Sequence, residues 1–210
     1  SDHGTAIVGT VSGANNISFG SEVVFNSANT YSGAPVYDST NGKVVIAYTD
    51  AGNSSYGTAI VGTVSGTSIS FGSEVVFNSA NTTYTSATFD STNGKVVIAY
   101  NDVSNSSYGT AIVGTVSGTS ISFGTAVVFE SGTTNHSSAT YDSTNKKVVI
   151  AYSDGSNNNY GTAVVLSTTS ATTNLTAENY IGIAAEAISN TATGKINILG
   201  GVNTGQTGLT

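Results

Sequence analysis

The sequence predicts an all-β fold, a β-propeller of four four-stranded blades whose ring closes by pairing the N- and C-terminal strands in one composite blade. Three observations favour it. A 52-residue step relates Tyr56, Tyr108 and Tyr160. Each period contains four β-rich runs separated by turn residues. The chain opens in the middle of one period and ends in segments that resemble its missing half. Repeats of about 40–50 residues with four strands each are typical of propeller blades.

We expect a single domain over residues 1–210. Its units span about 36–86, 87–137 and 138–179, and residues 1–30 and 180–210 supply the composite blade. The phrase YGTAIVGTVSGTSISFG occurs from Tyr56 and again from Tyr108. Near-identity of the copies indicates recent duplication of one unit.

Within a unit the four strands follow in order. The first is short (Ser86–Asp90) and leads through Ser-Thr-Asn-Gly into Lys95–Tyr100, since Asn-Gly between β-rich runs is a strong hairpin signal. The second is continuously apolar, which suits a strand covered on both faces. The third (Gly109–Val116) consists of small and β-branched residues. The fourth (Ile121–Phe129) carries the bulky aromatic residues.

Side-chain size favours a propeller. The first strand is built from Ser, Ala and Thr, as a crowded centre requires, and Phe and Val occupy the last strand, where blades diverge. An open β-solenoid and a string of small sandwiches are the alternatives.

The two ends predict the closing blade. Thr5–Val11 and Ile17–Phe25 match third and fourth strands, and Tyr180–Ile188 and Lys195–Gly201 match first and second strands. Such pairing would remove two open sheet edges. Thr176–Ser189 alone has a helix-compatible pattern, although its repeat position favours a strand. From Ser1 and Thr210 we expect a processed or excised fragment.

Composition excludes several classes of function. The chain has 5 Lys, no Arg and 12 acidic residues, giving a net charge of −7. A chain without a basic face is a poor nucleic-acid binder. The absence of Cys removes disulfides, thiolate metal sites and cysteine nucleophiles. No apolar run is long enough to insert into a membrane.

We expect a binding surface on the propeller face formed by the loops after the second and fourth strands. These loops are rich in Asn, Ser, Thr and Tyr, which recognise the hydroxyl groups and C–H patches of sugars. Ordinary polar turns are the plain alternative. The candidate ligand-binding residues are Asp50, Asn53, Tyr56, Asp102, Asn105, Tyr108, Asp154, Asn157 and Tyr160. The loops after the fourth strands are Asn26–Ser32, Asn78–Thr85 and Glu130–Ser137. The opposite face carries the tight Asn-Gly and Ser-Gly-Thr turns.

Two sets of repeated aspartates have structural interpretations. Asp50, Asp102 and Asp154 would cap loop amides. A Ca²⁺ site there is the weaker alternative, because one carboxylate per loop is few for an ion that takes six to eight oxygens. Asp38, Asp90 and Asp142 precede the hairpin turn and would accept backbone N–H bonds in it. We therefore predict no cofactor.

The sequence predicts no enzyme. Glycoside hydrolysis needs two neighbouring carboxylates, whereas the repeated acids would be spread around the ring. No Ser-His-Asp set, histidine pair for a metal or phosphate-binding glycine loop occurs. The residues unique to one unit are His3, His136, Glu130, Glu178 and Glu186. A hydrolase depending on Glu178 or Glu186 is the third hypothesis.

The segments GKVVIAYND and YGTAIVGTVSGTSISFGSEVVFNSANTTYTSATFDSTN resemble repeats of tail-fibre or appendage-like proteins of bacteriophages, especially marine ones, with predicted β-propeller repeats. The resemblance covers about residues 1–170, and Asn179–Thr210 is similar to a segment that follows those repeats. It implies a role at a virion surface and supplies no catalytic or binding residues.

The leading hypothesis is a non-catalytic recognition or adhesion module. It would sit in a phage tail fibre or another extracellular appendage and bind a host-surface glycan or receptor, with oligomeric display supplying avidity. A structural subunit of a filament, capsid or surface layer is the alternative.

Overall fold

The computed structural model describes residues 2–13, 15–166, 196–198 and 201–203. The chain divides into two compact units, Ser1–Thr168 and Thr169–Thr210. Apart from one turn of 3₁₀ helix, η1 (Ala51–Asn53), the regular structure of the described residues is entirely β. The predicted all-β class with repeating strand units is confirmed.

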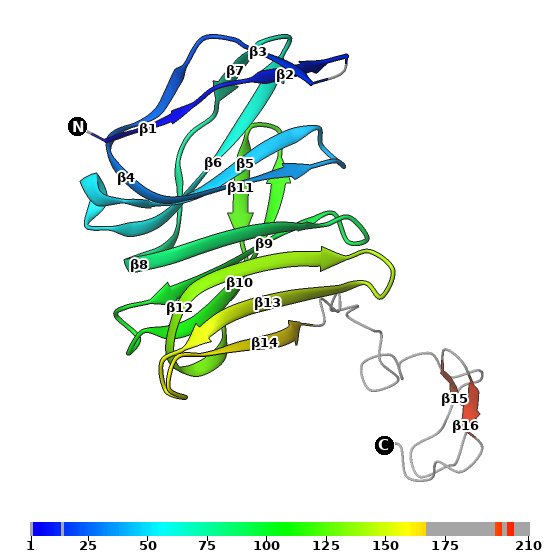
Figure 1. Ribbon diagram of the computed structural model, residues 1–210. Coiled ribbons are helices and arrows are strands. Elements are labelled where there is room, and N and C mark those ends of the chain that lie inside the picture. The colour runs from blue at the N-terminus through cyan, green and yellow to red at the C-terminus, as the bar shows by residue number, and fades with distance from the viewer. Residues whose placement is uncertain (1, 14, 167–195, 199–200, 204–210) are drawn as a thin grey trace. The chain divides into compact units, whose positions relative to one another are not determined.

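The first unit contains fourteen strands joined by antiparallel pairing (Figure 1). They are β1 (His3–Ala6), β2 (Gly9–Ser12), β3 (Asn16–Phe19), β4 (Val23–Asp38), β5 (Lys43–Asp50), β6 (Tyr56–Ser65), β7 (Ser68–Phe71), β8 (Val75–Asp90), β9 (Lys95–Asp102), β10 (Tyr108–Ser117), β11 (Ser120–Phe123), β12 (Val127–Asp142), β13 (Lys147–Asp154) and β14 (Tyr160–Leu166). The hydrogen-bonded order is β1-β4-β5-β6-β8-β9-β10-β12-β13-β14. In addition, β7 pairs with β6, β11 with β10, and β2 with β3.

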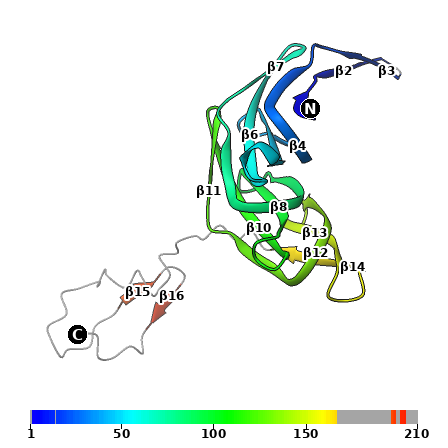
Figure 2. The same ribbon diagram turned by 90° about the vertical axis from the view of Figure 1, so that its left-hand side faces the viewer.

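Three long strands, β4, β8 and β12, connect one repeat to the next, and β8 contacts both of the others (Figure 2). The first half of β8 pairs with β6 and its second half with β9. A register shift between Thr83 and Ser86 separates the halves, and Tyr84 there has a φ of 52°. The prediction of a separate first strand at Ser86–Asp90 is therefore wrong. The fourth strand of one repeat continues through a bend into the first strand of the next.

The prediction of a single fourth strand at Ile121–Phe129 is also wrong, because this segment is divided between two strands. It breaks between β11 and β12, where the Gly124 amide donates to the Val113 carbonyl at 3.0 Å. The equivalent bond joins Gly72 to Val61. The structural repeats are thus residues 30–81 (repeat 1), 82–133 (repeat 2) and 134–166 (repeat 3), preceded by a half repeat over residues 2–29.

The core lies between the sheets of successive repeats. One face of repeat 1, including Val45, Ala47 and Val61, packs in one buried cluster with Val96 and Ile98 of repeat 2. The continuous apolar run predicted for the second strand is explained by this burial on both faces. Aromatic rings pack in the same cluster, as in Phe77 of repeat 1 and Tyr100 of repeat 2, whose ring centroids are 5.2 Å apart.

The N-terminal half repeat forms third and fourth strands, as predicted, but both are interrupted. Thr5–Val11 is divided into β1 and β2 around Ile7 and Val8, and Ile17–Phe25 into β3 and the start of β4.

The second unit is described only at β15 (Ile196–Ile198) and β16 (Gly201–Asn203), which pair with each other. β15 falls inside the predicted strand Lys195–Gly201, but the chain has reversed direction by Gly201. Tyr180–Ile188 and the ambiguous segment Thr176–Ser189 lie outside the described residues.

Candidate functional site

One end of the repeats gathers the three polar loops and the bends of the long strands, an area that we call the loop–bend face. Backbone hydrogen bonds join the two kinds of segment. The Thr82 amide donates to the Ser55 carbonyl at 3.0 Å, and the Thr134 amide to the Ser107 carbonyl at 3.0 Å. Both sets of predicted loops therefore do share one face. The segments Asn26–Ser32, Asn78–Thr85 and Glu130–Ser137, however, are bent strands rather than loops.

The aspartates of the loops are structural caps, as predicted. Asp50 Oδ1 accepts from the Gly52 amide at 3.0 Å and from Asn26 Nδ2 at 3.0 Å. Asp102 Oδ1 accepts from the Asn105 amide at 3.3 Å, and Asp154 Oδ1 from the Ser156 amide at 3.0 Å. These carboxylates fix the loop backbone.

The other candidate residues differ in exposure. Asn53, Asn105 and Asn157 are exposed in all three loops. Tyr56 and Tyr108 are half-buried, whereas Tyr160 is 60% exposed. Each loop thus exposes at least one amide side chain, the third loop also exposes Asn158 and Asn159, and only the third exposes more than half of its tyrosine.

A buried tyrosine lies two residues before each capping aspartate. The Tyr48 hydroxyl donates to Glu74 Oε1 at 2.7 Å, and the Tyr152 hydroxyl to Glu130 Oε2 at 3.0 Å. Burial, followed by the Glu130 contact, raises the pKa of Tyr152 to about 12. Burial likewise raises the pKa of Tyr48 and of Tyr100. These hydroxyls are neutral donors under the loops rather than acids or bases.

The opposite end, which we call the turn end, has the architectural role predicted for it. Asp90 Oδ1 accepts from the amides of Thr92 and Asn93 at 3.0 and 3.1 Å, and Asp38 and Asp142 repeat the pattern. Asn93 contributes through its side chain, which donates to Asp90 Oδ2 at 2.7 Å. The positive φ of the turn falls on the residue after Asn, as at Gly94.

The residues unique to one unit have individual environments. Glu130 accepts the Tyr152 hydrogen bond described above. His136 lies in the bend of β12, and its ring centroid is 4.6 Å from that of Tyr84 in β8. His3 lies in β1 and is exposed. Glu178 and Glu186 lie outside the described residues.

The contact between the Tyr84 and His136 rings could not be predicted from segments treated as separate loops. A signal is nevertheless present, because the two residues occupy the same position of neighbouring repeats.

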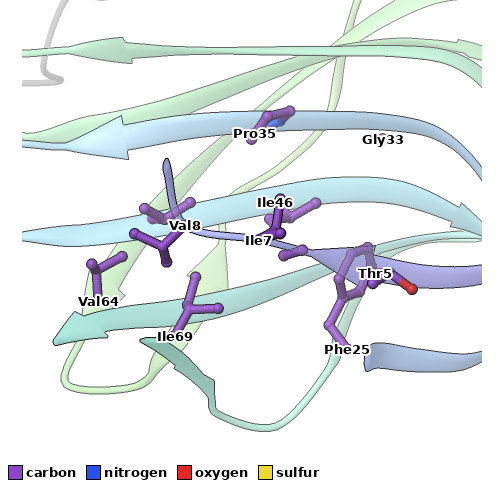
Figure 3. Close-up of a pocket in the computed structure, with 11 residues that line it drawn as sticks. Thr5, Ile7, Val8, Phe25, Gly33, Pro35, Ile46, Val64 and Ile69 are labelled. Atoms are coloured by element: carbon purple, nitrogen blue, oxygen red, sulfur yellow. The ribbon is translucent and has the colours of Figure 1, made fainter. Parts of the chain in front are cut away.

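An apolar pocket of about 380 Å³ lies between the half repeat and repeat 1 (Figure 3). Phe25 and Val8 from the half repeat and Ile46 and Ile69 from repeat 1 line it, and Figure 3 shows their side chains converging on the space. Its lining offers a polar ligand little to bind, so it does not belong to the loop–bend face.

Among the described residues, no three His, Asp or Glu side chains come together as a metal site, and no helix has the length and hydropathy of a membrane span. The chain matches no protein-family model, no curated protein and no solved structure.

Proposed function

We propose that this chain is a non-catalytic recognition module that binds a glycan of a host surface through the loop–bend face. The observation that supports it best is the repetition of exposed amide side chains, at Asn53, Asn105 and Asn157, on a rigid hydrogen-bonded scaffold at one end. Amide groups and aromatic rings suit the hydroxyl groups and C–H faces of sugars. The setting would be a phage tail fibre or another extracellular appendage, where several copies raise avidity.

The test is a glycan array probed with the full chain, displayed as a streptavidin tetramer, with and without calcium. Binding to a defined glycan class in both conditions is expected, because the loop carboxylates are occupied as caps. Absence of binding above background in both conditions would contradict the proposal.

The proposal includes a closed four-bladed ring. At the interface between repeats 1 and 2, the second strand of repeat 1 is fully covered, since Val45 and Ala47 in it are both 0% exposed. The half repeat contains no such strand among its described residues, and Tyr37 is 59% exposed where the equivalent Phe89 is 9% exposed. Segments from residues 180–210 would cover this region and complete the blade.

Ring closure can be tested by cross-linking, because the natural chain has no cysteine. In repeat 1, Val45 of the second strand pairs with Val61 of the third strand. By alignment of the repeats, Asn197 corresponds to Val45 and Val8 corresponds to Val61. The variant Val8→Cys/Asn197→Cys should form an intramolecular disulfide in the monomer. A disulfide only between chains would show that closure involves a second copy.

One observation favours the alternative of a structural subunit. Ala151, Ala163 and Val165 are exposed in repeat 3, whereas their counterparts Ala47, Ala59 and Val61 have 0% exposure. A second copy could pack on such a face, head to tail. Electron microscopy at high protein concentration discriminates, since filaments would support assembly and single particles would support recognition.

A further inference from the structure

Two exposed rings occupy the bends of neighbouring long strands. Tyr84 in β8 and His136 in β12 are equivalent positions 52 residues apart. Their centroids are 4.6 Å apart with an interplanar angle of 56°. The two tilted rings contact each other across two repeats, and we call them the ring pair.

The ring pair is held by an unfavourable backbone conformation. Both residues have a φ of 52°, a left-handed conformation that costs conformational energy at a bulky residue and none at glycine. His136 is exposed and Tyr84 is 36% exposed, so burial offsets this cost only in part. Strain of this kind concentrates at binding sites. At the third such position Ser32 has a φ of 53° and carries no ring.

The same two bends contain buried polar atoms without a partner. Thr85 Oγ1 and Ser137 Oγ, each directly after a member of the ring pair, have no hydrogen bond. Asn101 is 2% exposed. Its Nδ2 donates to the Thr134 carbonyl at 2.5 Å, while its Oδ1 has no partner. Since buried polar groups are normally satisfied and these atoms are closed off from the surface, they point to ordered water inside the protein.

Charge restricts the class of ligand. The four described lysines, Lys43, Lys95, Lys146 and Lys147, all lie at the turn end. The loop–bend face instead carries the capping aspartates and Glu130. Anionic sugars would be repelled there, and none of the described lysines is placed to pair with them.

We propose that the ring pair binds a neutral saccharide, with its exposed ring surface stacking on one pyranose ring. The inference rests on the proposed function and assigns its site and ligand class. Stacking supplies the contact area, and the left-handed backbone places both rings on the surface.

Glycine variants test the site, because glycine accepts the backbone conformation and leaves the fold intact. Tyr84→Gly and His136→Gly should each weaken binding to the neutral glycan identified on the array by about tenfold, and the melting temperature of each variant checks that the fold is retained. Ser32→Gly is the matched control, with the same backbone change and unaltered affinity. Thr85→Val, at a side chain closed off from the surface, is a second control and should leave the affinity unaltered. Sialylated and sulfated versions of the glycan should bind more weakly.

Histidine NMR gives a direct readout, since the chain has only two histidines. Titration with the neutral glycan should shift the His136 ring resonances and leave those of His3 in place.

If the natural chain binds glycan while both glycine variants retain full affinity, the site is elsewhere and the proposed function stands. If the natural chain binds no glycan, the proposed function itself fails.

Discussion

At the scale of single residues, most of the repeated polar positions maintain the fold. Thr82 illustrates this, because its hydroxyl accepts from Asn78 Nδ2 at 2.9 Å and donates to the Ala80 carbonyl at 3.0 Å. Asp90 and Asp102 likewise satisfy turn amides. These roles could be predicted from the sequence, because Asx and ST turns depend on neighbouring residues only.

The left-handed backbone at Tyr84 could not be predicted in that way. Tyrosine and its threonine neighbours favour extended strands, so local preference gives no sign of a bend. The conformation arises where one strand must pair with two different sheets, which is a property of the assembled repeats.

Glycine at the start of each third strand is required by close packing. A Cβ on Gly109 would lie 2.6 Å from Phe129 Cε2 and 2.7 Å from Thr134 Oγ1. We expect Gly109→Ala to lower the free energy of unfolding by about 1–3 kcal/mol, as overpacking does. Gly161 is the matched control, since a Cβ there meets nothing within 4 Å. Gly161→Ala should be stabilising by about 0.4–1 kcal/mol. Urea denaturation measures both, and equal effects would contradict this interpretation.

The turn carboxylates predict that the stability of the fold decreases at acid pH. The side-chain hydrogen bond from Asn145, followed by backbone bonds, lowers the pKa of Asp142. Because the folded pKa lies below the unfolded one, the contribution is complete above pH of about 4 and is lost as the pH falls through the folded pKa. Carbon-13 NMR titration should show a higher pKa for Asp142 in Asn145→Ala. An unchanged value would show that the backbone donors alone are responsible.

At the scale of elements, the second and third strands could be predicted because each is a complete pairing unit. The predicted Lys95–Tyr100 and Gly109–Val116 lie within β9 and β10. The end of the fourth strand could not be predicted, since the β-rich sequence pattern continues across the break at Gly124. A Cβ on the equivalent Gly72 would lie 1.9 Å from the Thr119 carbonyl oxygen of the next repeat. Both breaks share a backbone bond to the third strand of the same repeat, and at Gly72 contact with the next repeat also leaves no room for a side chain.

The buried tyrosines near the ends of the second strands predict that the stability of the fold decreases at alkaline pH. The pKa of Tyr152 is raised to about 12, whereas an unfolded tyrosine titrates near 10. Stability is therefore complete below pH of about 10 and decreases as the pH rises through the folded pKa. Urea unfolding at increasing pH should show a less steep decrease in Tyr152→Phe than in the natural chain. Equal slopes would mean that Tyr152 ionises without unfolding.

At the scale of the whole molecule, the repeat predicts contacts that local reasoning cannot. Each internal interface joins unlike faces of two neighbouring repeats, so a linear array must leave one face of each kind at its ends. The exposure of Ala151 and of Tyr37 marks those two faces. The pairing of the chain ends stays a prediction, and the sequence cannot distinguish closure within one chain from pairing of two chains, because both satisfy the same contacts.

A charge placed on the face after repeat 3 distinguishes a covered surface from a free one. Ala99 has 0% exposure, so Ala99→Arg should be strongly destabilising because the cation lacks a partner. Ala151 is its equivalent in repeat 3. In a closed ring Ala151→Arg should lower the melting temperature of the monomer, at any protein concentration. In a head-to-tail assembly the loss should appear only at concentrations where copies associate.

The control is Ser104→Arg, in an exposed loop, which should be neutral within about 0.5 kcal/mol. If Ala151→Arg behaves like Ser104→Arg throughout, neither closure nor assembly covers that face, and the four-bladed ring is wrong.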